Sequence, residues 1–338
     1  MSIFVTGGAG FIGSQFIRDW VRRFPTQEVI NFDKLTYAGN LENLASVESH
    51  AGYCLVRGDI CDTQAVAEAI PEQCDAIVHF AAESHVDRSI MSAAEFATTN
   101  VVGTQVLLDA ARRKGVRRFV HISTDEVGGS IPEDSFFRED SPLNPSSPYA
   151  ASKAAAEHMV RAAAHTFGLD IVVTRTTNNY GPFQFPEKLL PLAIGNALEN
   201  RPVPVYGDGL QVRDWIHVAD NCRAIMMVLE HGRAGETYHI GGRNPQPNRA
   251  VLALLLKILG RSEELLTRVT DRLGHDRRYA VDCSKIECEL GWEPEIPFEE
   301  GLRETIRWYQ ANAGWLERAR SGEYRDYYER LYGAAARS

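Results

Sequence analysis

Short apolar segments recur along the first half of the chain, and helix-like segments separate them. The strand candidates are residues 2–6, 28–32, 53–56, 75–80, 117–123 and 170–175, and the clearest helical stretches are 100–114 and 148–167. Strands that alternate with helices are joined by crossover connections, so this order predicts a parallel sheet covered by helices on both faces. Residues 1–178 are therefore expected to form a doubly wound α/β domain.

The pattern changes after Tyr180, where proline and glycine become frequent and helices alternate irregularly with short strands. We interpret residues 179–210 and 241–338 as a smaller, mixed α/β substrate domain above the carboxyl ends of the sheet, where doubly wound folds bind ligands. A segment near 211–240 is expected to return to the first domain. The helical, charged tail from Gly301 is interpreted as a surface helix.

A glycine-rich turn, Gly7-Gly-Ala-Gly10-Phe-Ile-Gly13, joins the first strand candidate to a helix. Such a turn directs backbone N–H groups and a helix N-terminus at a pyrophosphate, although packing alone also produces it. A second apolar run ends at Asp33, whose carboxylate suits a ribose 2′-hydroxyl and repels a 2′-phosphate. The turn and the acid together predict a Rossmann-type site for NAD rather than NADP. Lys34 either weakens the preference for NAD over NADP or is a solvated loop lysine.

Later strand ends extend the predicted cofactor site. Asp59-Ile60 follows one strand candidate, and the small residues of Phe80-Ala81-Ala82 follow another. An aspartate at a strand end suits the adenosine, and small residues let a dinucleotide lie close to the backbone. Each of these features fits packing equally well when it is taken alone.

Composition narrows the class of protein. The 338 residues are enough for one large or two modest domains with a real core. The net charge of −9 argues against a nucleic-acid or membrane-surface partner, and no apolar run approaches a membrane-spanning length. The chain opens directly on a strand candidate, so we expect no signal peptide. The six cysteines lack metal-binding spacing, so we expect reduced thiols, a cytoplasmic location and no metal.

Redox chemistry is indicated by Thr124, at the end of a strand candidate, and by Tyr149 and Lys153 on the next long helix. The last two are four residues apart and share a helix face. A free phenol has a pKa of about 10, so it needs a nearby ammonium and the positive charge of NAD to act as a base. Two surface residues would give the same spacing, but a preceding dinucleotide site favours catalysis.

Asp125 and Glu126 are two carboxylates that simple alcohol oxidation does not need. Removing water beside a newly formed ketone needs one base and one acid, and an adjacent pair can supply both. The alternative is a helix-capping pair or two loop acids. His79, His85 and His121 are interpreted as structural side chains.

The chain resembles the extended short-chain dehydrogenases/reductases, and among them the dTDP-glucose 4,6-dehydratases. The resemblance runs nearly from end to end and rests on segments 6–13, 33–39, 81–89, 123–127, 147–153, 178–182, 185–189, 211–215 and 274–279. The first of these and the Tyr/Lys motif belong to the whole superfamily. Thr-Asp-Glu, Pro-Glu-Lys and His-Asp-Arg-Arg-Tyr are specific to sugar-nucleotide 4,6-dehydratases.

The resemblance implies NAD-dependent conversion of a nucleoside-diphosphate sugar to its 4-keto-6-deoxy product. Tyr149 would deprotonate the 4-hydroxyl with help from Thr124 and Lys153, Glu126 would take the C5 proton, and Asp125 would protonate the leaving 6-hydroxyl. The expected cofactor residues are Gly7, Gly10, Phe11, Ile12, Gly13, Asp33, Lys34, Thr36, Gly39, Asp59, Ile60, Phe80, Ala81, Ala82, Ser84, Thr99, Tyr149, Lys153 and Asn178. The expected substrate residues are Ser84, His85, Thr124, Asn179, Glu187, Lys188, Leu189, Pro204, Tyr206, Arg213, Asn248, His275 and Tyr279. Arg213 and His275 would face the diphosphate.

The resemblance also implies a homodimer. Relatives pair through two helices in a four-helix bundle, and here 148–167 is rich in alanine while 100–114 carries an apolar stripe. Small residues allow helices to approach closely. The alternative is that both stripes only cover the sheet.

One position departs from the family pattern. Gly128 and Gly129 follow the acid/base pair where a tyrosine is usual, which loosens the backbone and leaves open a roomier pocket, another substrate or lower activity. The alternative functions are a UDP-sugar 4,6-dehydratase, a sugar-nucleotide 4-epimerase and, from a different class, an NAD-binding regulatory protein.

Overall fold

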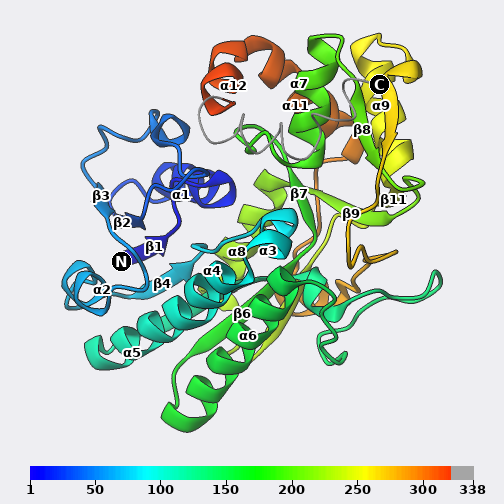
Figure 1. Ribbon diagram of the computed structural model, residues 1–338. Coiled ribbons are helices and arrows are strands. Elements are labelled where there is room, and N and C mark those ends of the chain that lie inside the picture. The colour runs from blue at the N-terminus through cyan, green and yellow to red at the C-terminus, as the bar shows by residue number, and fades with distance from the viewer. Residues whose placement is uncertain (321–338) are drawn as a thin grey trace.

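A seven-stranded parallel sheet forms the centre of the first domain. The computed structural model describes residues 1–320, and the sheet order is β10-β6-β5-β4-β1-β2-β3 (Figure 1). The strands are β1 (Ser2–Thr6), β2 (Glu28–Asp33), β3 (Tyr53–Arg57), β4 (Ala76–His79), β5 (Arg118–Thr124), β6 (Ile171–Thr176) and β10 (Thr237–Ile240). The order reverses between β1 and β4, and doubly wound sheets bind ligands at such a point. The predicted Rossmann-type fold is thus confirmed.

Helices cover both faces of this sheet because successive strand residues point to opposite sides. In β1, Ile3 and Val5 belong to one buried cluster and Phe4 to another. The first cluster packs under α1 (Phe11–Arg23) and α8 (Val218–His231). The second packs under α2 (Thr63–Ala69), α5 (Thr104–Lys114) and α6 (Pro148–Phe167), and α5 and α6 lie side by side (Figure 1).

Local sequence sets the ends of α6, which match the predicted 148–167. The Ser147 hydroxyl accepts a hydrogen bond from the Ala150 N–H at 3.1 Å, and Pro148 occupies the first turn. Gly168 ends the helix at φ 68°, a conformation that glycine adopts without strain. These signals hold Tyr149 and Lys153 in the first turns of the helix.

The predicted helix 100–114 begins differently from the prediction. Short helices α3 (Val86–Met91) and α4 (Ala93–Ala97) lead into a π-helical stretch, Thr98–Gly103, and α5 starts only at Thr104. The Asn100 amide donates both to the Glu83 carbonyl and to the Ser152 hydroxyl. Periodicity did not predict this wider turn, because tertiary hydrogen bonds hold it.

The second domain has two small sheets and its own core. One sheet joins β7 (Asn178–Tyr180), β9 (Val212–His217) and β11 (Pro245–Pro247), and the other joins β8 (Val203–Tyr206) and β12 (Leu266–Val269). Helices α7 (Leu189–Leu198), α9 (Asn248–Leu259), α11 (Phe298–Ala311) and α12 (Ala313–Ala319) bury the second core, and α10 (Ser284–Leu290) packs near β10. Of the segment 211–240, α8 and β10 lie with the large sheet, whereas β9 lies in a small one.

The tail from Gly301 is more than a surface helix, and that prediction was wrong. Leu302, Ile306 and Tyr309 are fully or almost fully buried in the second core. The indole N–H of Trp315 donates to the Asn43 side chain at 3.1 Å, which ties α12 to the first domain. Residues 321–338, the rest of that tail, lie outside the described part of the chain. None of the helices described has both the length and the apolar character that crossing a membrane requires.

Candidate active site

A cavity of about 320 Å³ opens at the carboxyl ends of the central strands, where the second domain meets the sheet. It is lined by every residue of the predicted cofactor set and by all five predicted catalytic residues. Of the predicted substrate residues it is lined by Ser84, Thr124, Asn179, Glu187 and Lys188. One continuous space therefore joins the glycine turn to the catalytic side chains.

The glycine turn leaves no room for side chains between strand and helix. Gly7 has φ +69°, and a Cβ on it would lie 2.5 Å from the Ala81 nitrogen. A Cβ on Gly13 would lie 2.3 Å from the Gly7 carbonyl oxygen. Helix α1 has no acidic residue in its first turn and no side-chain cap, so its first N–H groups remain for an anion. The turn fits a dinucleotide pyrophosphate.

Asp33 sits where a ribose would be held. Its two carboxylate oxygens accept hydrogen bonds from Ala9 N at 2.9 Å and Leu35 N at 2.8 Å, which fixes the side chain at the cavity wall. Burial raises the pKa of Asp33, and the two backbone bonds oppose the increase. The Lys34 ammonium is paired with Asp59 at 2.7 Å, so it is not simply a solvated loop lysine. A carboxylate beside a paired cation favours a ribose hydroxyl over a 2′-phosphate.

Tyr149 and Lys153 face the cavity from α6. The Lys153 ammonium donates to the Ile122 carbonyl at 2.7 Å, and burial lowers its pKa to about 8. Burial also raises the pKa of Tyr149, the charges of Glu126 and Asp125 add to the increase, and a hydrogen bond from Thr124 opposes it. The Lys153 ammonium is directed at a backbone carbonyl and is not among the groups that lower the pKa of Tyr149. Lys153 was expected to act together with the charge of NAD, and that combination stays a prediction. The remaining positive charge must come from a bound ligand.

Asp125 and Glu126 open a short 3₁₀ helix, η3 (Asp125–Gly128), directly after β5. The cap is Thr124, whose hydroxyl accepts from Glu126 N at 3.3 Å and donates to Asp125 Oδ1 at 3.2 Å. Since Thr124 fills the capping role, both carboxyl groups are left to face the cavity. The interpretation of the two acids as a capping pair is therefore not supported.

The two carboxyl groups have different surroundings. Asp125 is 4% exposed, and no donor in the described residues reaches its Oδ2. Its pKa lies well above the usual range, first because of burial and then because of the Glu126 charge. Burial also raises the pKa of Glu126, but the positive charges of Arg272 and Arg213 oppose the increase. Two neighbouring carboxyl groups whose surroundings shift their pKa values differently suit one acid and one base.

Gly128 does not widen the large cavity, which it does not line. A Cβ at this position would lie 2.8 Å from the Phe137 ring, so that ring already fills the space beside the glycine. Gly129 has φ +73°, and a Cβ on it would lie 2.2 Å from the Asn144 carbonyl oxygen. The idea of a roomier pocket was therefore wrong, since the loop that carries Phe137 closes over η3.

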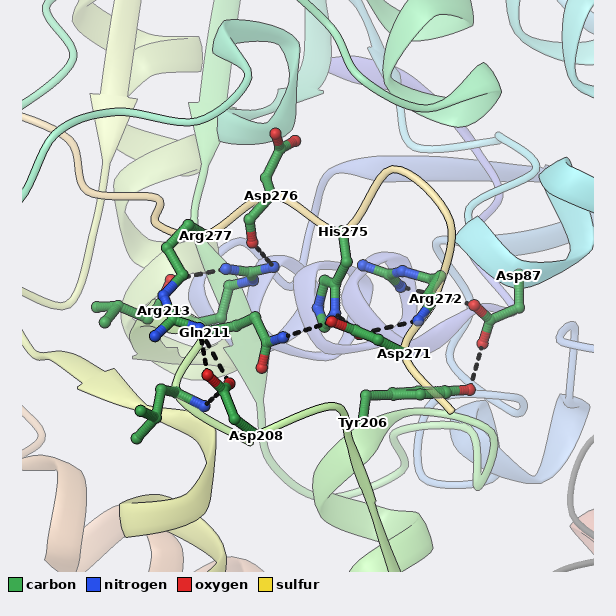
Figure 2. Close-up of polar contacts among 12 residues, drawn as sticks. Asp87, Tyr206, Asp208, Gln211, Arg213, Asp271, Arg272, His275, Asp276 and Arg277 are labelled. Atoms are coloured by element: carbon green, nitrogen blue, oxygen red, sulfur yellow. Dashed lines mark hydrogen bonds and ion pairs between the residues drawn. The ribbon is translucent and has the colours of Figure 1, made fainter. Parts of the chain in front are cut away.

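The other predicted substrate residues lie outside the large cavity: His85, Leu189, Pro204, Tyr206, Arg213, Asn248, His275 and Tyr279. Three of them, Tyr206, Arg213 and His275, form a second polar group together with Gln211, Asp271 and Arg272 (Figure 2). We name these six residues the cationic cluster. The charges of Arg213 and Arg272 both act on Glu126, which places the cluster beside the catalytic carboxylates.

Hydrogen bonds hold the cationic cluster in place (Figure 2). Arg213 donates to the Asp276 carbonyl at 2.9 Å and lies 4.1 Å from the centre of the Tyr279 ring. His275 Nδ1 and Gln211 Nε2 both contact the Asp271 carboxylate, at 2.6 and 3.1 Å. Burial lowers the pKa of His275 to about 4, so near neutral pH it meets an anion as a neutral hydrogen-bonding group.

Two of the predicted substrate residues, Asn179 and Asn248, carry an amide oxygen without a partner among the described residues. Asn179 Oδ1 and Asn248 Oδ1 are buried and accept no hydrogen bond. The Asn179 amide nitrogen donates to the Thr176 hydroxyl at 2.9 Å, which fixes its orientation. Buried polar atoms of this kind are normally satisfied, so both amides are candidates for ligand contacts.

The histidines at the strand ends have structural contacts. His79 lies 2.8 Å from the Thr6 hydroxyl and 3.0 Å from the Thr104 hydroxyl, which agrees with its structural interpretation. His121 is fully buried beside it, as expected for the core. His85 is buried at the contact between the domains, where its Nε2 lies 3.4 Å from the Glu187 carbonyl oxygen.

Arg272, Gln211 and Asp87 were missed by the sequence argument. Asp87 lies within the matched segment 81–89 and Gln211 opens segment 211–215, but neither was given a role. Arg272 lies two residues before segment 274–279, and a loop arginine resembles any surface charge. Only the fold brings the three together. No group of three or more His, Cys, Asp or Glu suited to a metal ion occurs in residues 1–320.

The sheet order, the glycine turn and the Thr124, Tyr149 and Lys153 group define a short-chain dehydrogenase/reductase fold, and two adjacent carboxyl groups, Asp125 and Glu126, line the same cavity. The family model described as GDP-mannose 4,6 dehydratase matches residues 4–305, and the chain belongs to this family.

Close relatives carry a more specific name. The dTDP-glucose 4,6-dehydratase of Streptomyces niveus is 53% identical over 325 residues, which are 95% of this chain and 96% of that protein. dTDP-glucose 4,6-dehydratase 1 of Escherichia coli is 48% identical and covers 98% of this chain and 99% of its own. The crystal structure of the dTDP-glucose 4,6-dehydratase from Streptomyces venezuelae, with NAD bound, has a TM-score of 0.92 and 52% identity and covers 94% of this chain and 100% of its own.

More distant relatives share the fold. The UDP-glucose 4-epimerase of Thermotoga maritima, solved with UDP-glucose, superposes with a TM-score of 0.86 at 30% identity, covering 93% of this chain and 100% of its own. The fold alone thus does not separate a dehydratase from an epimerase, and the site must do so.

Proposed function

We propose that the protein is an NAD-dependent lyase that converts dTDP-glucose to dTDP-4-keto-6-deoxyglucose by 4,6-dehydration. The observation that carries this proposal is the placement of Asp125 and Glu126 in the same cavity as Thr124, Tyr149 and Lys153. Oxidation at C4 needs the last three side chains, and elimination across C5–C6 needs the first two. The relatives at about half identity bear the name of this activity.

NAD fits the part of the cavity that the glycine turn lines. The glycine turn and the start of α1 would hold its pyrophosphate, and Asp33 would hold the adenosine ribose. When bound, the cofactor accepts a hydride from C4, returns it to C6, and in its oxidised form brings a positive charge beside Tyr149.

The chain's own residues move the protons. Tyr149 takes the proton of the 4-hydroxyl, while Thr124 hydrogen-bonds the same oxygen and Lys153 supplies positive charge. The 4-ketone acidifies the C5 proton because the resulting carbanion is delocalised as an enolate. Glu126 removes that proton, and Asp125 protonates the leaving 6-hydroxyl, so that water departs.

The proton balance then closes. Glu126 returns its proton to C5 when C6 is reduced, and the proton that Tyr149 received replaces the one that Asp125 gave. The raised pKa of Asp125 suits a carboxyl group that must start protonated. The neighbouring cations keep Glu126 easier to ionise, as a base requires.

The second domain holds the sugar nucleotide. Asn179, Glu187 and Lys188 line the cavity beside the catalytic residues and contact the hexose. The cationic cluster, with Asn248 and Tyr279, holds the diphosphate and the nucleoside. Residues 1–178, with α8 and β10 of the returning segment near 211–240, thus serve the cofactor. Gln211 and Arg213 of that segment serve the substrate, together with 179–210 and 241–320.

An epimerase or a UDP-sugar dehydratase is the alternative. An epimerase returns the hydride to C4 and has no use for an acid and a base at C5 and C6, so Asp125 and Glu126 count against it. A regulatory NAD-binding protein would not need Thr124, Tyr149 and Lys153 in one cavity.

Incubation of the purified protein with dTDP-glucose, UDP-glucose and GDP-mannose, followed by mass spectrometry of the products, tests these alternatives. We expect loss of one water from dTDP-glucose at the highest kcat/KM. A product of unchanged mass and inverted C4 would make the protein an epimerase. Absence of turnover on all three would favour the regulatory protein.

We also propose that the protein is a cytoplasmic homodimer, paired through α5 and α6 in a four-helix bundle. The exposed apolar residues Val102, Ile90 and Met91 lie on or beside these helices and support this surface. Large apolar side chains on one face commonly mark an interface.

A further inference from the structure

The segment 84–88, which leads into and begins α3, joins the first domain to the second at the edge of the cavity. The Ser84 carbonyl accepts from the Lys188 ammonium at 2.8 Å. The Arg88 guanidinium donates to the Glu187 carboxylate at 3.1 Å and lies 3.8 Å from the centre of the Tyr37 ring. One short segment therefore contacts the residues predicted at the hexose.

Asp87 reaches in the other direction, to the cationic cluster (Figure 2). Its Oδ2 accepts a hydrogen bond from the Tyr206 hydroxyl at 3.0 Å, and its Oδ1 lies 3.8 Å from Arg272 Nη1. The whole residue is 8% exposed, so both contacts are shielded from water. Asp87 is a carboxylate of the first domain that holds two side chains of the second.

Both partners of Asp87 belong to the second domain. Tyr206 is the last residue of β8, and Arg272 lies in the loop after β12. Among the described residues, the buried Nε of Arg272 has no hydrogen-bond partner. The ion pair of the Arg272 guanidinium is with this carboxylate across the domain boundary, so Asp87 contributes to the position of that guanidinium.

We propose that Asp87 is a positioning residue for the nucleotide end of the substrate: it sets Tyr206 and Arg272 before the diphosphate and nucleoside bind. The proposal rests on the proposed function, since it takes the cationic cluster as the binding site of a nucleoside diphosphate. If two long side chains are ordered before the substrate arrives, the entropy lost in ordering them no longer weakens binding. Arg88, the next residue, fixes Glu187 at the hexose end, so α3 sets both ends of the site from one turn.

Binding of dTDP to the NAD-loaded protein, measured by calorimetry, tests the inference without turnover. We expect Asp87→Ala to weaken dTDP binding about tenfold and to raise KM similarly, with kcat changed less than about twofold, because the nucleotide end does not react. Asp87→Asn keeps an acceptor for the tyrosine hydroxyl but loses the charge beside Arg272, so its effect should be intermediate.

A double-mutant cycle separates positioning from general damage. Tyr206→Phe removes the same hydrogen bond from the other side, so Asp87→Ala combined with Tyr206→Phe should bind dTDP about as weakly as the worse single variant. Independent effects that multiply would overturn the proposal. Asp134→Ala, the same change at an exposed loop carboxylate, is the control and should leave binding and KM unchanged.

The outcomes keep the two proposals apart. If the wild-type protein itself does not bind dTDP, the assignment of the nucleotide seat fails before any variant is compared. If the wild type binds dTDP and Asp87→Ala binds it equally well, only the role of Asp87 fails. Equal losses in kcat and kcat/KM with a normal dTDP affinity would likewise overturn it.

Discussion

At the scale of single residues, two adjacent carboxyl groups differ because their neighbours differ. Asp125 is buried with one oxygen unpartnered in the described structure, whereas Glu126 lies within the field of Arg213 and Arg272. The proposed roles agree with this contrast, since an acid must start protonated and a base must be able to ionise. Each role can be tested by replacing the carboxyl group with its amide.

Glu126→Gln should stop removal of the C5 proton but still permit oxidation at C4. We expect reduced cofactor to accumulate in a single turnover with dTDP-glucose, and dehydration to fall by at least about 100-fold, the lower range for loss of a general base. Stopped-flow absorbance of NADH measures the first quantity and mass spectrometry the second. Dehydration at a near wild-type rate would show that another residue is the base.

Asp125→Asn should raise thermal stability while it lowers activity. The pKa of Asp125 is raised in the folded protein, so its stabilising contribution is complete below the unfolded pKa of about 4 and is lost as pH rises towards the folded pKa. An asparagine does not titrate. The stability advantage of the variant, followed as Tm, should therefore widen as pH rises above about 4, by up to about 1.4 kcal/mol of unfolding free energy per pH unit.

Calorimetry at constant excess NAD measures this difference, because groups that titrate in both proteins cancel. Asp134→Asn changes an exposed carboxylate and should show no pH-dependent difference. A Tm advantage that shrinks as pH rises would mean that Asp125 is held as a stabilised carboxylate, and the acid role would be lost with it.

At the scale of elements, the turn between β1 and α1 depends on glycine for close approach. Gly13→Ala would place a methyl group 2.3 Å from the Gly7 carbonyl oxygen, so the helix start must move away from the pyrophosphate. We expect the purified variant to carry less than about a tenth of the NAD of the wild type, a loss of roughly 1.4 kcal/mol in binding. Chromatography of the nucleotide released on denaturation measures both its amount and its identity.

Gly260→Ala provides the matched control. Gly260 ends α9 at φ +65°, and a Cβ there meets nothing within 4 Å. This variant should lose about 1 kcal/mol of stability and keep its NAD. NADP as the main released nucleotide in the wild type would contradict the assignment of Asp33.

The regular elements could be predicted because local signals specify them. Strand ends at Thr124 and Asp33, the glycine turn and the limits of α6 all follow from short segments. The π-helical stretch before Thr104 could not be predicted, because the hydrogen bonds of Asn100 reach Glu83 and Ser152, which are distant in sequence. The buried tail helix was missed for a similar reason, since its apolar stripe needs the second core as its partner.

The site divides in the same way. Residues attached to strand ends or to α6 were predictable, because the fold class fixes where those ends meet. The cationic cluster brings β8, β9 and the loop near Arg272 together, and no local sequence pattern predicts this arrangement. Phe137 beside Gly128 is a further case, because the ring comes from a loop that a single bridge between Phe137 and the distant Val281 holds.

At the scale of the whole molecule, a single chain leaves large apolar side chains of the first domain exposed to solvent. Val102 is 52% exposed, Met91 53% and Ile90 37%. Exposed alanines such as Ala151 and Ala162 lie on α6, which packs against α3, the π-helical stretch and α5. Exposed large apolar groups beside small residues suit close helix packing. We therefore predict a homodimer, with each active site made by one chain.

Light scattering at micromolar concentration should give twice the chain mass of 37.6 kDa. Val102→Glu should shift the mass towards that of one chain, because a charge then has to be buried at the interface without a partner. Since Val102 is already half exposed in the monomer, the variant should still fold and retain NAD. Phe136→Glu, at an equally exposed apolar residue on the loop before α6, should remain dimeric. A wild-type mass of one chain, or a Val102→Glu variant that stays dimeric, would exclude pairing through α5 and α6.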